Sequence, residues 1–337
     1  MVGDAATLDW LLDPGQSDPA IRWQVLRDLQ QAPESAWSAE RARVETEGVG
    51  ARLLAAADDD GQWDGGAHFP ADWTWGSDEP QPWTSTSHSL TLLRTFGLDP
   101  SSARAAEMVA LIGANCRWEH DNQPYWEGEV EPCINGTAVA NGSYFGVDMS
   151  PVVDRLTGEV LADGGWNCEA EYGSVRSSFD STINVLEGLH EFERATGGTE
   201  ASRDARRSGE EYLLRRSLFR RLSTGAAADE DYLRLLHPFR WHHSVLRALD
   251  HFREASLLTA TPPDARLDES IGYLRSRRLD DGRWPLDHTL PGRSWFDLDA
   301  GEGEPSRWVT LRAMRILAWW DAATPGSSRA RGPATPS

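Results

Sequence analysis

The sequence predicts an all-α protein, an (α/α)6 toroid in which outer and inner helices alternate around a ring. Three observations predict this fold: a helical pattern that recurs along the chain, amphipathic segments between its copies, and a turn motif that returns at equivalent points. Clean runs of alternating β-branched residues, the usual sign of strands, are lacking. The prediction therefore rests on repetition rather than on any single segment.

The recurring helical pattern is Arg-Trp, then two or more residues, then Leu-Arg-x-Leu or Leu-Arg-x-Met. Clear copies occupy residues 22–29, 240–249 and 307–314, and weaker copies occupy 86–93 and 181–189. The long step between the copies at 86–93 and 181–189 leaves room for one more, and residues 133–145 lie in that gap. Self-similarity at a regular period indicates a repeat architecture, so six related inner helices are expected.

Charged, amphipathic segments separate these copies. They occupy residues 34–57, 101–116, 151–162, 202–222 and 264–279. A helix with one polar and one apolar face lies at the surface of a protein, so these segments are predicted to be the outer helices.

The turn motif is Asp-Gly-x-Trp, at residues 60–63, 163–166 and 281–284. Each copy follows an outer segment and precedes an inner one. Glycine reaches the positive φ values that tight turns need, and the tryptophan is then placed to pack beneath the turn, between neighbouring helices. The motif thus predicts where an outer helix ends and the next inner helix begins.

Residues 1–324 are expected to form a single toroid domain, and the tail 325–337, rich in Pro, Gly, Ser and Ala, is expected to be disordered. Two long loops, 65–82 and 285–305, are rich in Trp, Gly, Pro and acidic residues. Long ordered loops commonly carry binding residues or form lids, so both loops are candidates to border a site.

Composition and charge exclude some partners. The formal net charge of −20 repels phosphate backbones, so nucleic acid and anionic membranes are not expected as partners. A signal peptide and apolar runs of about 18 residues are lacking, which favours a cytoplasmic protein without a transmembrane segment. Three cysteines favour reduced thiols over a disulfide framework. The expected partner is a small-molecule substrate, apolar or sugar, and the sequence leaves room for a homo-oligomer.

The region that most suggests a site is residues 127–181. It contains Cys133, Cys168 and a concentration of carboxylates, and Gly and Asn interrupt the helices there. The two thiols, with His242 or His243 from a later inner helix, are candidate zinc ligands, because thiolate and imidazole commonly bind zinc and a catalytic site keeps one position open. The alternative is that the cysteines are small buried hydrophobes.

Carboxylates of the same region are candidate catalytic groups. Asp180 lies near the start of an inner helix, where it either caps the helix or acts as a general acid or as a stabiliser of a developing cation. Glu169 and Glu171 follow the second Asp-Gly-x-Trp turn. A pair drawn from these acids and Glu131 suits acid–base chemistry on a glycoside. His242 is a candidate ligand, proton carrier or cap.

Sixteen tryptophans supply candidate pocket walls. Those predicted to line a pocket are Trp83, Trp126, Trp166, Trp241 and Trp308. Aromatic faces attract a prenyl chain or a carbocation, the latter through cation–π interaction, and they also stack on sugar rings. Burial between helix layers is the alternative for each of them.

The Asp-Gly-x-Trp turn between paired helices resembles the QW-type repeat of the squalene cyclase and protein prenyltransferase superfamily, over roughly residues 20–320. The resemblance implies an α/α toroid whose inner-helix N-termini surround an aromatic-lined cavity. It also implies a terpenoid cyclase or prenyltransferase type of enzyme, acting on an apolar or isoprenoid-like substrate. The Asp-x-Asp-Asp acid of class II cyclases has only Asp297-Leu-Asp299-Ala300 as its nearest counterpart.

Protein prenyltransferases hold zinc with an Asp-x-Cys pair and a later histidine, and Glu131-Pro132-Cys133 resembles that pair. The resemblance therefore implies Glu131 and Cys133 as zinc ligands, with His243 or His242 as the distant partner. Cys168 is a further candidate ligand from the residue pattern itself.

Two other functions compete with this one. The first is a carbohydrate-active (α/α)6 hydrolase or lyase that uses paired carboxylates, and the second is a non-catalytic toroid that binds a ligand or a protein. An isoprenoid enzyme requires a cavity with few polar groups, whereas a glycosidase requires two carboxylates facing one cleft. The lining of the cavity is therefore the observation that separates them.

Overall fold

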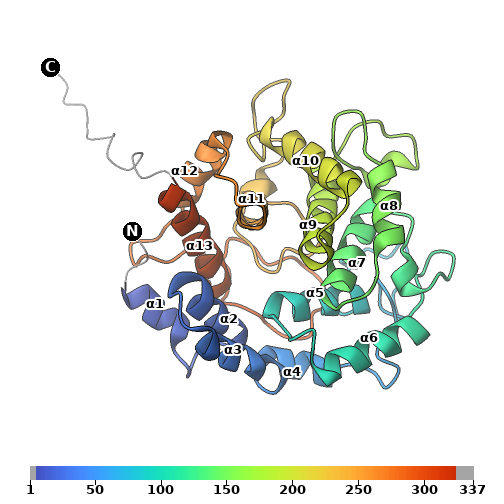
Figure 1. Ribbon diagram of the computed structural model, residues 1–337, viewed down its shortest axis with the longest axis horizontal. Helices are drawn as coiled ribbons and strands as arrows, with labels where there is room; N and C mark the ends of the chain where they lie inside the picture. Colours follow the sequence, from blue (N-terminus) through green and yellow to red (C-terminus); the bar gives the residue numbers. More distant parts are fainter. Residues whose placement is uncertain (1–4, 324–337) are drawn as a thin grey trace.

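The computed structural model describes residues 5–323, and the tail predicted at 325–337 lies outside this range. Over the described residues the chain forms helices joined by loops, with isolated β-bridges but no β-strand. Figure 1 shows the helices in two layers around a ring. The all-α toroid that the sequence predicts is thus confirmed.

Inner and outer helices alternate along the chain. The inner helices are α2 (Pro19–Gln24, continued by a π-helical turn, Val25–Leu29), α5 (Thr86–Phe96), α7 (Pro132–Tyr144), α9 (Phe179–Thr196), α11 (Val245–Thr259) and α13 (Arg307–Ala323). The outer layer contains α1 (Ala5–Leu12), α3 (Glu34–Ala42), α4 (Gly48–Ala55), α6 (Ala103–Asn115), α8 (Ser150–Gly158), α10 (Glu200–Leu214) and α12 (Asp268–Ser276). Helix α7 occupies the gap in which the repeat spacing placed a further copy.

The Asp-Gly-x-Trp turns join the two layers in the same way each time. The three tryptophans are buried, and each indole Nε1 donates to a leucine carbonyl near the end of the preceding outer helix. These bonds are Trp63 to Leu53 (2.9 Å), Trp166 to Leu156 (2.8 Å) and Trp284 to Leu274 (2.8 Å). The turn glycines Gly61, Gly164 and Gly282 have φ of 86°, 106° and 86°. The predicted burial of each tryptophan beneath its turn is therefore observed.

A threonine of the following inner helix completes each junction. The backbone N–H of the tryptophan donates to a threonine Oγ1 in the first turn of that helix or just beyond it. These pairs are Trp63 with Thr86 (3.2 Å), Trp166 with Thr182 (3.1 Å) and Trp284 with Thr310 (3.0 Å). One residue thus links the end of an outer helix to the start of an inner helix, which fixes the inner-helix N-termini that border the cavity.

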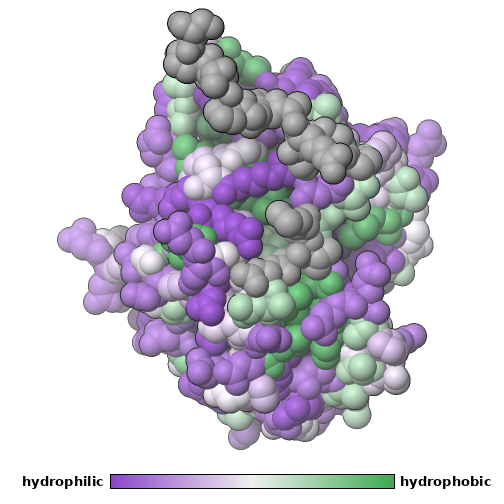
Figure 2. All heavy atoms as spheres, turned by 90° about the vertical axis from the view of Figure 1, so that its left-hand side faces the viewer, coloured by the Kyte–Doolittle hydropathy of each residue, from purple (hydrophilic) through white to green (hydrophobic). Residues whose placement is uncertain are grey.

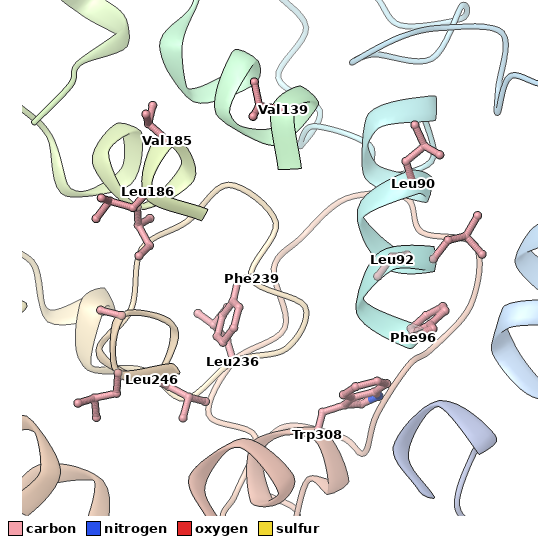
Figure 3. Packing of buried hydrophobic residues seen from close by; sticks show 14 of the residues in the cluster. Leu90, Leu92, Phe96, Val139, Val185, Leu186, Leu236, Phe239, Leu246 and Trp308 are labelled. Carbon is pink, nitrogen blue, oxygen red and sulfur yellow. The ribbon is translucent and has the colours of Figure 1, made fainter. Parts of the chain in front are cut away.

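The first and last repeats close the ring. Arg315 of α13 donates through Nη1 to Oε1 of Gln24 in α2, at 3.0 Å. Trp308 of α13 packs against Phe96 of α5, with ring centroids 5.9 Å apart. Figure 3 shows Trp308 and Phe96 among buried hydrophobic residues contributed by several inner helices. The core is therefore continuous around the ring rather than divided between its halves.

One face of the molecule is mainly polar (Figure 2). Figure 2 shows a face on which hydrophilic residues predominate and hydrophobic areas are smaller and interspersed. Among the helices of residues 5–323, none combines the length and the apolar character that crossing a membrane requires.

Candidate functional site

The inner helices enclose a cavity of about 900 Å³. All six inner helices contribute to its wall, together with the loop 65–82 and the segment before α11. The loop 65–82 therefore borders a cavity, as its length and composition predict. The second long loop, 285–305, lines a smaller neighbouring cavity of about 260 Å³.

Arginines and carboxylates are numerous among the residues that line the large cavity. Its arginines are Arg27, Arg41, Arg94, Arg194, Arg240, Arg247, Arg312 and Arg315. Its carboxylates are Glu119, Glu129, Glu131, Glu169, Asp180, Glu187, Glu191, Asp250 and Glu254. Aliphatic side chains such as Leu92 and Ile134 are few among the lining residues. The cavity thus differs from the apolar, aromatic-walled cavity that the resemblance implies, because aromatic rings stand here among ionised groups.

Cys133 and Cys168 meet in this wall. Cys133 lies in the first turn of α7, and Cys168 opens a short 3-10 turn (Cys168–Ala170) after the second Asp-Gly-x-Trp motif. Their Cα atoms are 6.4 Å apart, and a disulfide joins them. The reduced thiols favoured by the sequence are therefore not the form described. The third cysteine, Cys116, is buried and free.

Glu131 completes a group of three potential metal ligands with these cysteines. One carboxylate oxygen and the two sulfur atoms all lie within 4.8 Å of one another, and Oε2 of Glu131 is 3.4 Å from Sγ of Cys133. Burial raises the pKa of Glu131, and the charges of Glu129, Glu169 and Glu171 raise it further. A cation beside Glu131 would relieve this crowding of negative charge.

Ser181 contacts Cys168 from the first turn of α9. Its Oγ donates to Sγ of Cys168 at 3.2 Å and accepts from the backbone N–H of the same residue at 3.1 Å. This pair of bonds fixes the direction in which the sulfur points. The hydroxyl of Ser178 in turn caps α9, because it accepts from the backbone N–H of Ser181 at 3.0 Å.

Asp180 lines the cavity beside this group, and the residue that caps its helix is Ser178. The capping role offered for Asp180 by its position in the sequence is therefore not the one observed. Its Oδ1 accepts from the backbone N–H of His243 at 2.7 Å, and its Oδ2 accepts from Oη of Tyr232 at 3.0 Å. Two donors thus hold the carboxylate in one orientation at the cavity wall.

The two histidines before α11 do not join the sulfur pair. His243 is buried, its Nε2 lies 2.7 Å from the carbonyl oxygen of Leu218, and burial lowers its pKa to about 4. His242 stacks on Trp241 with ring centroids 3.7 Å apart, and burial also lowers its pKa. Neither lines the large cavity, so the zinc set expected from the resemblance lacks its histidine.

The predicted acids and tryptophans are divided between wall and scaffold. Glu169 and Trp241 line the large cavity and Trp83 lines the small one, whereas Glu171 is exposed outside both. Trp166 belongs to a turn junction, Trp126 donates to the carbonyl of Val109, and Trp308 stacks on His237. The ring faces or N–H groups of these three indoles contact neighbouring protein groups. They therefore belong to the packing between helices rather than to the cavity wall.

The charged network of the wall is the feature that the sequence interpretation missed. Arg247 forms two bonds to Glu187, Nε to Oε1 at 2.7 Å and Nη2 to Oε2 at 2.9 Å. Asp250 accepts from Arg312 at 2.6 Å and from Nε of Arg315 at 3.0 Å. Arg247 and Arg312 are the arginines of the Leu-Arg-x-Leu pattern, so the signal was present in the repeat and was used only to predict the fold.

Neither a protein-family model nor a curated protein matches this sequence. Among solved structures, the chain is similar to a glycosyl hydrolase of family 88 from Bacteroides vulgatus, with a TM-score of 0.51, 10% identity, and 94% of this chain and 97% of that chain covered. It also matches a protein from Actinoplanes (TM-score 0.44, 17% identity, 95% and 99% covered) and the type II terpene cyclase MstE from Scytonema (0.36, 14%, 87% and 99%). At 10% identity, the first likeness establishes the toroid fold and nothing further.

Proposed function

We propose that this chain is a zinc-dependent enzyme that acts on a polar small molecule in the toroid cavity. Its metal ligands are Glu131, Cys133 and Cys168. The observation that carries the proposal is the convergence of one carboxylate oxygen and two sulfurs within 4.8 Å of one another in the wall of a 900 Å³ cavity.

The donor set fits zinc when the two thiols are reduced. Thiolate and carboxylate both bind zinc, and three protein ligands with a fourth position open is the pattern of catalytic rather than structural sites. Cys133 lies in the first turn of a thirteen-residue helix, α7, where the helix dipole favours the thiolate. The hydroxyl of Ser181 orients Cys168, as hydrogen-bonded neighbours of metal ligands commonly do.

The remaining wall residues supply orientation and proton exchange. Bound zinc provides a Lewis acid or lowers the pKa of a bound water. Asp180 is held by the backbone N–H of His243 and the hydroxyl of Tyr232, and each of its oxygens keeps a lone pair for a proton of the substrate. Glu169 lines the same wall and is exposed to the cavity.

A polar substrate suits this lining better than an isoprenoid. An apolar chain in the cavity would strip water from arginines and carboxylates without replacing their hydrogen bonds, which costs free energy. Sugars are a second candidate class within the polar substrates. Phe69 and Trp75 favour them, because their rings lie at the cavity with centroids 4.5 Å apart and Trp75 is 66% exposed, which leaves aromatic surface for stacking.

The open coordination position is the property that separates an enzyme from a structural zinc protein. We would load the reduced full-length protein with Co²⁺ in place of zinc and record its visible spectrum. Two thiolate ligands produce sulfur-to-cobalt absorption, and azide added to an open site changes the spectrum because it enters the coordination sphere. We expect both effects.

The variant Cys116→Ala is the matched control, since it removes the cysteine outside the group. It should show the wild-type cobalt spectrum, whereas Cys133→Ser should lose intensity. A cobalt spectrum with thiolate absorption but no response to azide would indicate a closed structural site. An absence of thiolate absorption in the reduced wild type would refute the metal site itself.

A further inference from the structure

Arg240 differs from the other arginines of the cavity wall. The others donate hydrogen bonds to carboxylates, an amide oxygen, carbonyls or hydroxyls, as Arg247 does to Glu187 and Arg41 does to Tyr144. Within residues 5–323, the guanidinium of Arg240 forms neither an ion pair nor a hydrogen bond. An arginine in a cavity wall whose five N–H donors all lack a protein acceptor calls for an acceptor from outside the chain.

The position of Arg240 makes it available to a ligand. It lines both the large cavity and the smaller one, so it stands where the two meet. Its guanidinium carbon lies 5.4 Å from the ring centroid of Trp83, which supports one face of the group by cation–π attraction. Burial lowers the pKa of Arg240 to about 9, so the group remains cationic at neutral pH. Arg240 is half-buried, and its cation has no counter-charge among the described residues, so an anionic ligand would supply one.

His237 adds a second unpartnered group at the same place. Its side chain is 3% exposed, and neither ring nitrogen has a hydrogen-bond partner among the described residues. It lines both cavities together with Arg240 and stacks on Trp308 with ring centroids 4.5 Å apart. Burial, with Arg312 and Arg240 nearby, holds its pKa well below the usual value, so the ring is neutral and offers one N–H donor. Buried polar atoms are normally satisfied, and these two are not.

The carboxylates near this point do not neutralise Arg240. Asp297 and Asp299 line the smaller cavity. Asp299 accepts from the backbone N–H groups of Ala300 (2.9 Å) and Arg307 (3.2 Å) and from the hydroxyl of Ser306, so its oxygens are committed to the loop. Neither acid forms an ion pair with Arg240. The positive charge of Arg240 is thus not paired with either of these carboxylates, although the protein as a whole is acidic.

We propose that Arg240 and His237 bind an anionic group, a carboxylate or a phosphate, of the molecule that occupies the cavity. A planar guanidinium matches either group through two parallel N–H donors, and the neutral imidazole adds a third. The inference rests on the proposed function in one respect: it takes the molecule that occupies the cavity to be the substrate of the enzyme. Anion binding itself needs no metal.

The test uses the full-length protein after treatment with a chelator, so that it is independent of zinc. Inorganic phosphate and acetate are titrated separately, by calorimetry and by thermal unfolding, with chloride holding the ionic strength constant. We expect wild type to bind at least one of them and Arg240→Gln to bind it at least about tenfold more weakly, which is the loss of one charge-assisted pair. The anion that binds more tightly identifies the class.

Arg234→Gln is the matched control. Arg234 lies in the same segment before α11, is paired with Asp231 and is 45% exposed, so its loss changes the net charge equally and should leave anion binding unchanged.

Arg240→Gln should also still take up zinc, and Cys133→Ser should still bind the anion, so failure of one proposal is distinguishable from failure of the other. If Arg240→Gln does not fold, His237→Leu decides, with an expected loss of about threefold or more. Failure of wild type to bind either anion, or wild-type affinity in both variants, would overturn the inference.

Discussion

Glu187 and Arg247 occupy equivalent positions of the repeat on neighbouring inner helices, and they form a bidentate ion pair across the cavity wall. Glu187 follows Leu186 in α9, as Arg247 follows Leu246 in α11. Burial opposes ionisation of Glu187, but Arg247 and then Arg94 outweigh it and lower its pKa to about 2. A repeat that builds the ring thus also places opposite charges side by side within it.

The first prediction concerns how the free energy of unfolding depends on pH in the acidic range. The folded-state pKa of Glu187 lies below its ordinary value of 4.5, so its contribution is present above about pH 4.5 and is lost as the pH falls towards 2. It amounts to at most about 3 kcal/mol. We expect Glu187→Gln to lower the free energy of unfolding at pH 7. The difference in free energy of unfolding between the variant and wild type should become smaller as the pH falls to about 3. Urea unfolding at both pH values measures this, and a constant difference would contradict it.

The second prediction concerns the turn tryptophans. Trp166→Ala should lower the free energy of unfolding by about 3–5 kcal/mol, because it removes a buried indole and its bond to Leu156. Trp166→Phe should cost less, about 1–3 kcal/mol, since mainly the hydrogen bond is lost. Chemical unfolding followed by circular dichroism measures both. Trp75→Ala, at a site 66% exposed, is the control and should change stability by under about 0.5 kcal/mol. Equal losses of stability in Trp166→Ala and Trp75→Ala would contradict the idea that the turn tryptophan stabilises the junction between the two helix layers.

The third prediction concerns the hydrogen bond between Asp180 and Tyr232, which is 3.0 Å long. Tyr232→Phe removes the donor and should destabilise the protein by about 1.5–3 kcal/mol, because the acceptor is charged. The double-mutant cycle with Asp180→Asn should give a coupling free energy of about 0.5–3 kcal/mol. A coupling indistinguishable from zero would mean that the tyrosine does not orient the carboxylate.

The fourth prediction separates metal orientation from helix capping. Ser181→Ala removes the hydroxyl on Sγ of Cys168, and zinc affinity should fall about 10- to 100-fold. Ser102→Ala removes the cap of α6, a helix that contributes no residue to the cysteine group, and should cost about 1 kcal/mol of stability with zinc affinity little changed. Competition with a chromogenic chelator measures the affinity. The reverse pattern would show that the zinc effect is only a consequence of helix stability.

Much of the fold could be predicted because its signals are local and repeated. The Asp-Gly-x-Trp turns needed only glycine at positive φ and a tryptophan at a fixed distance, and all three are observed. The meeting of Cys133 and Cys168 could not be predicted in the same way, since 35 residues separate them and their contact depends on how α7 packs against α9. Trp308 was predicted to line a pocket from its place near a helix start, but tertiary packing stacks it on His237.

The charged residues of the cavity wall were missed for a related reason. Arg247 and Arg312 face the cavity because the leucines that precede them, Leu246 and Leu311, are buried in the core. Arg240 belongs to the Arg-Trp start of the repeat pattern, but the pattern does not show that its charge is unpaired, because an unpaired cation is recognised only when every neighbour is in place.

The most direct test of the central claim is the zinc content of the reduced full-length protein, by elemental analysis, for wild type, Cys133→Ser, Cys168→Ser and Cys116→Ala. We predict about one zinc per chain in wild type and in Cys116→Ala, and a large loss in the other two variants. Reduced wild-type protein that takes up no zinc, or that keeps it when Cys133 and Cys168 are replaced, would contradict the proposed site.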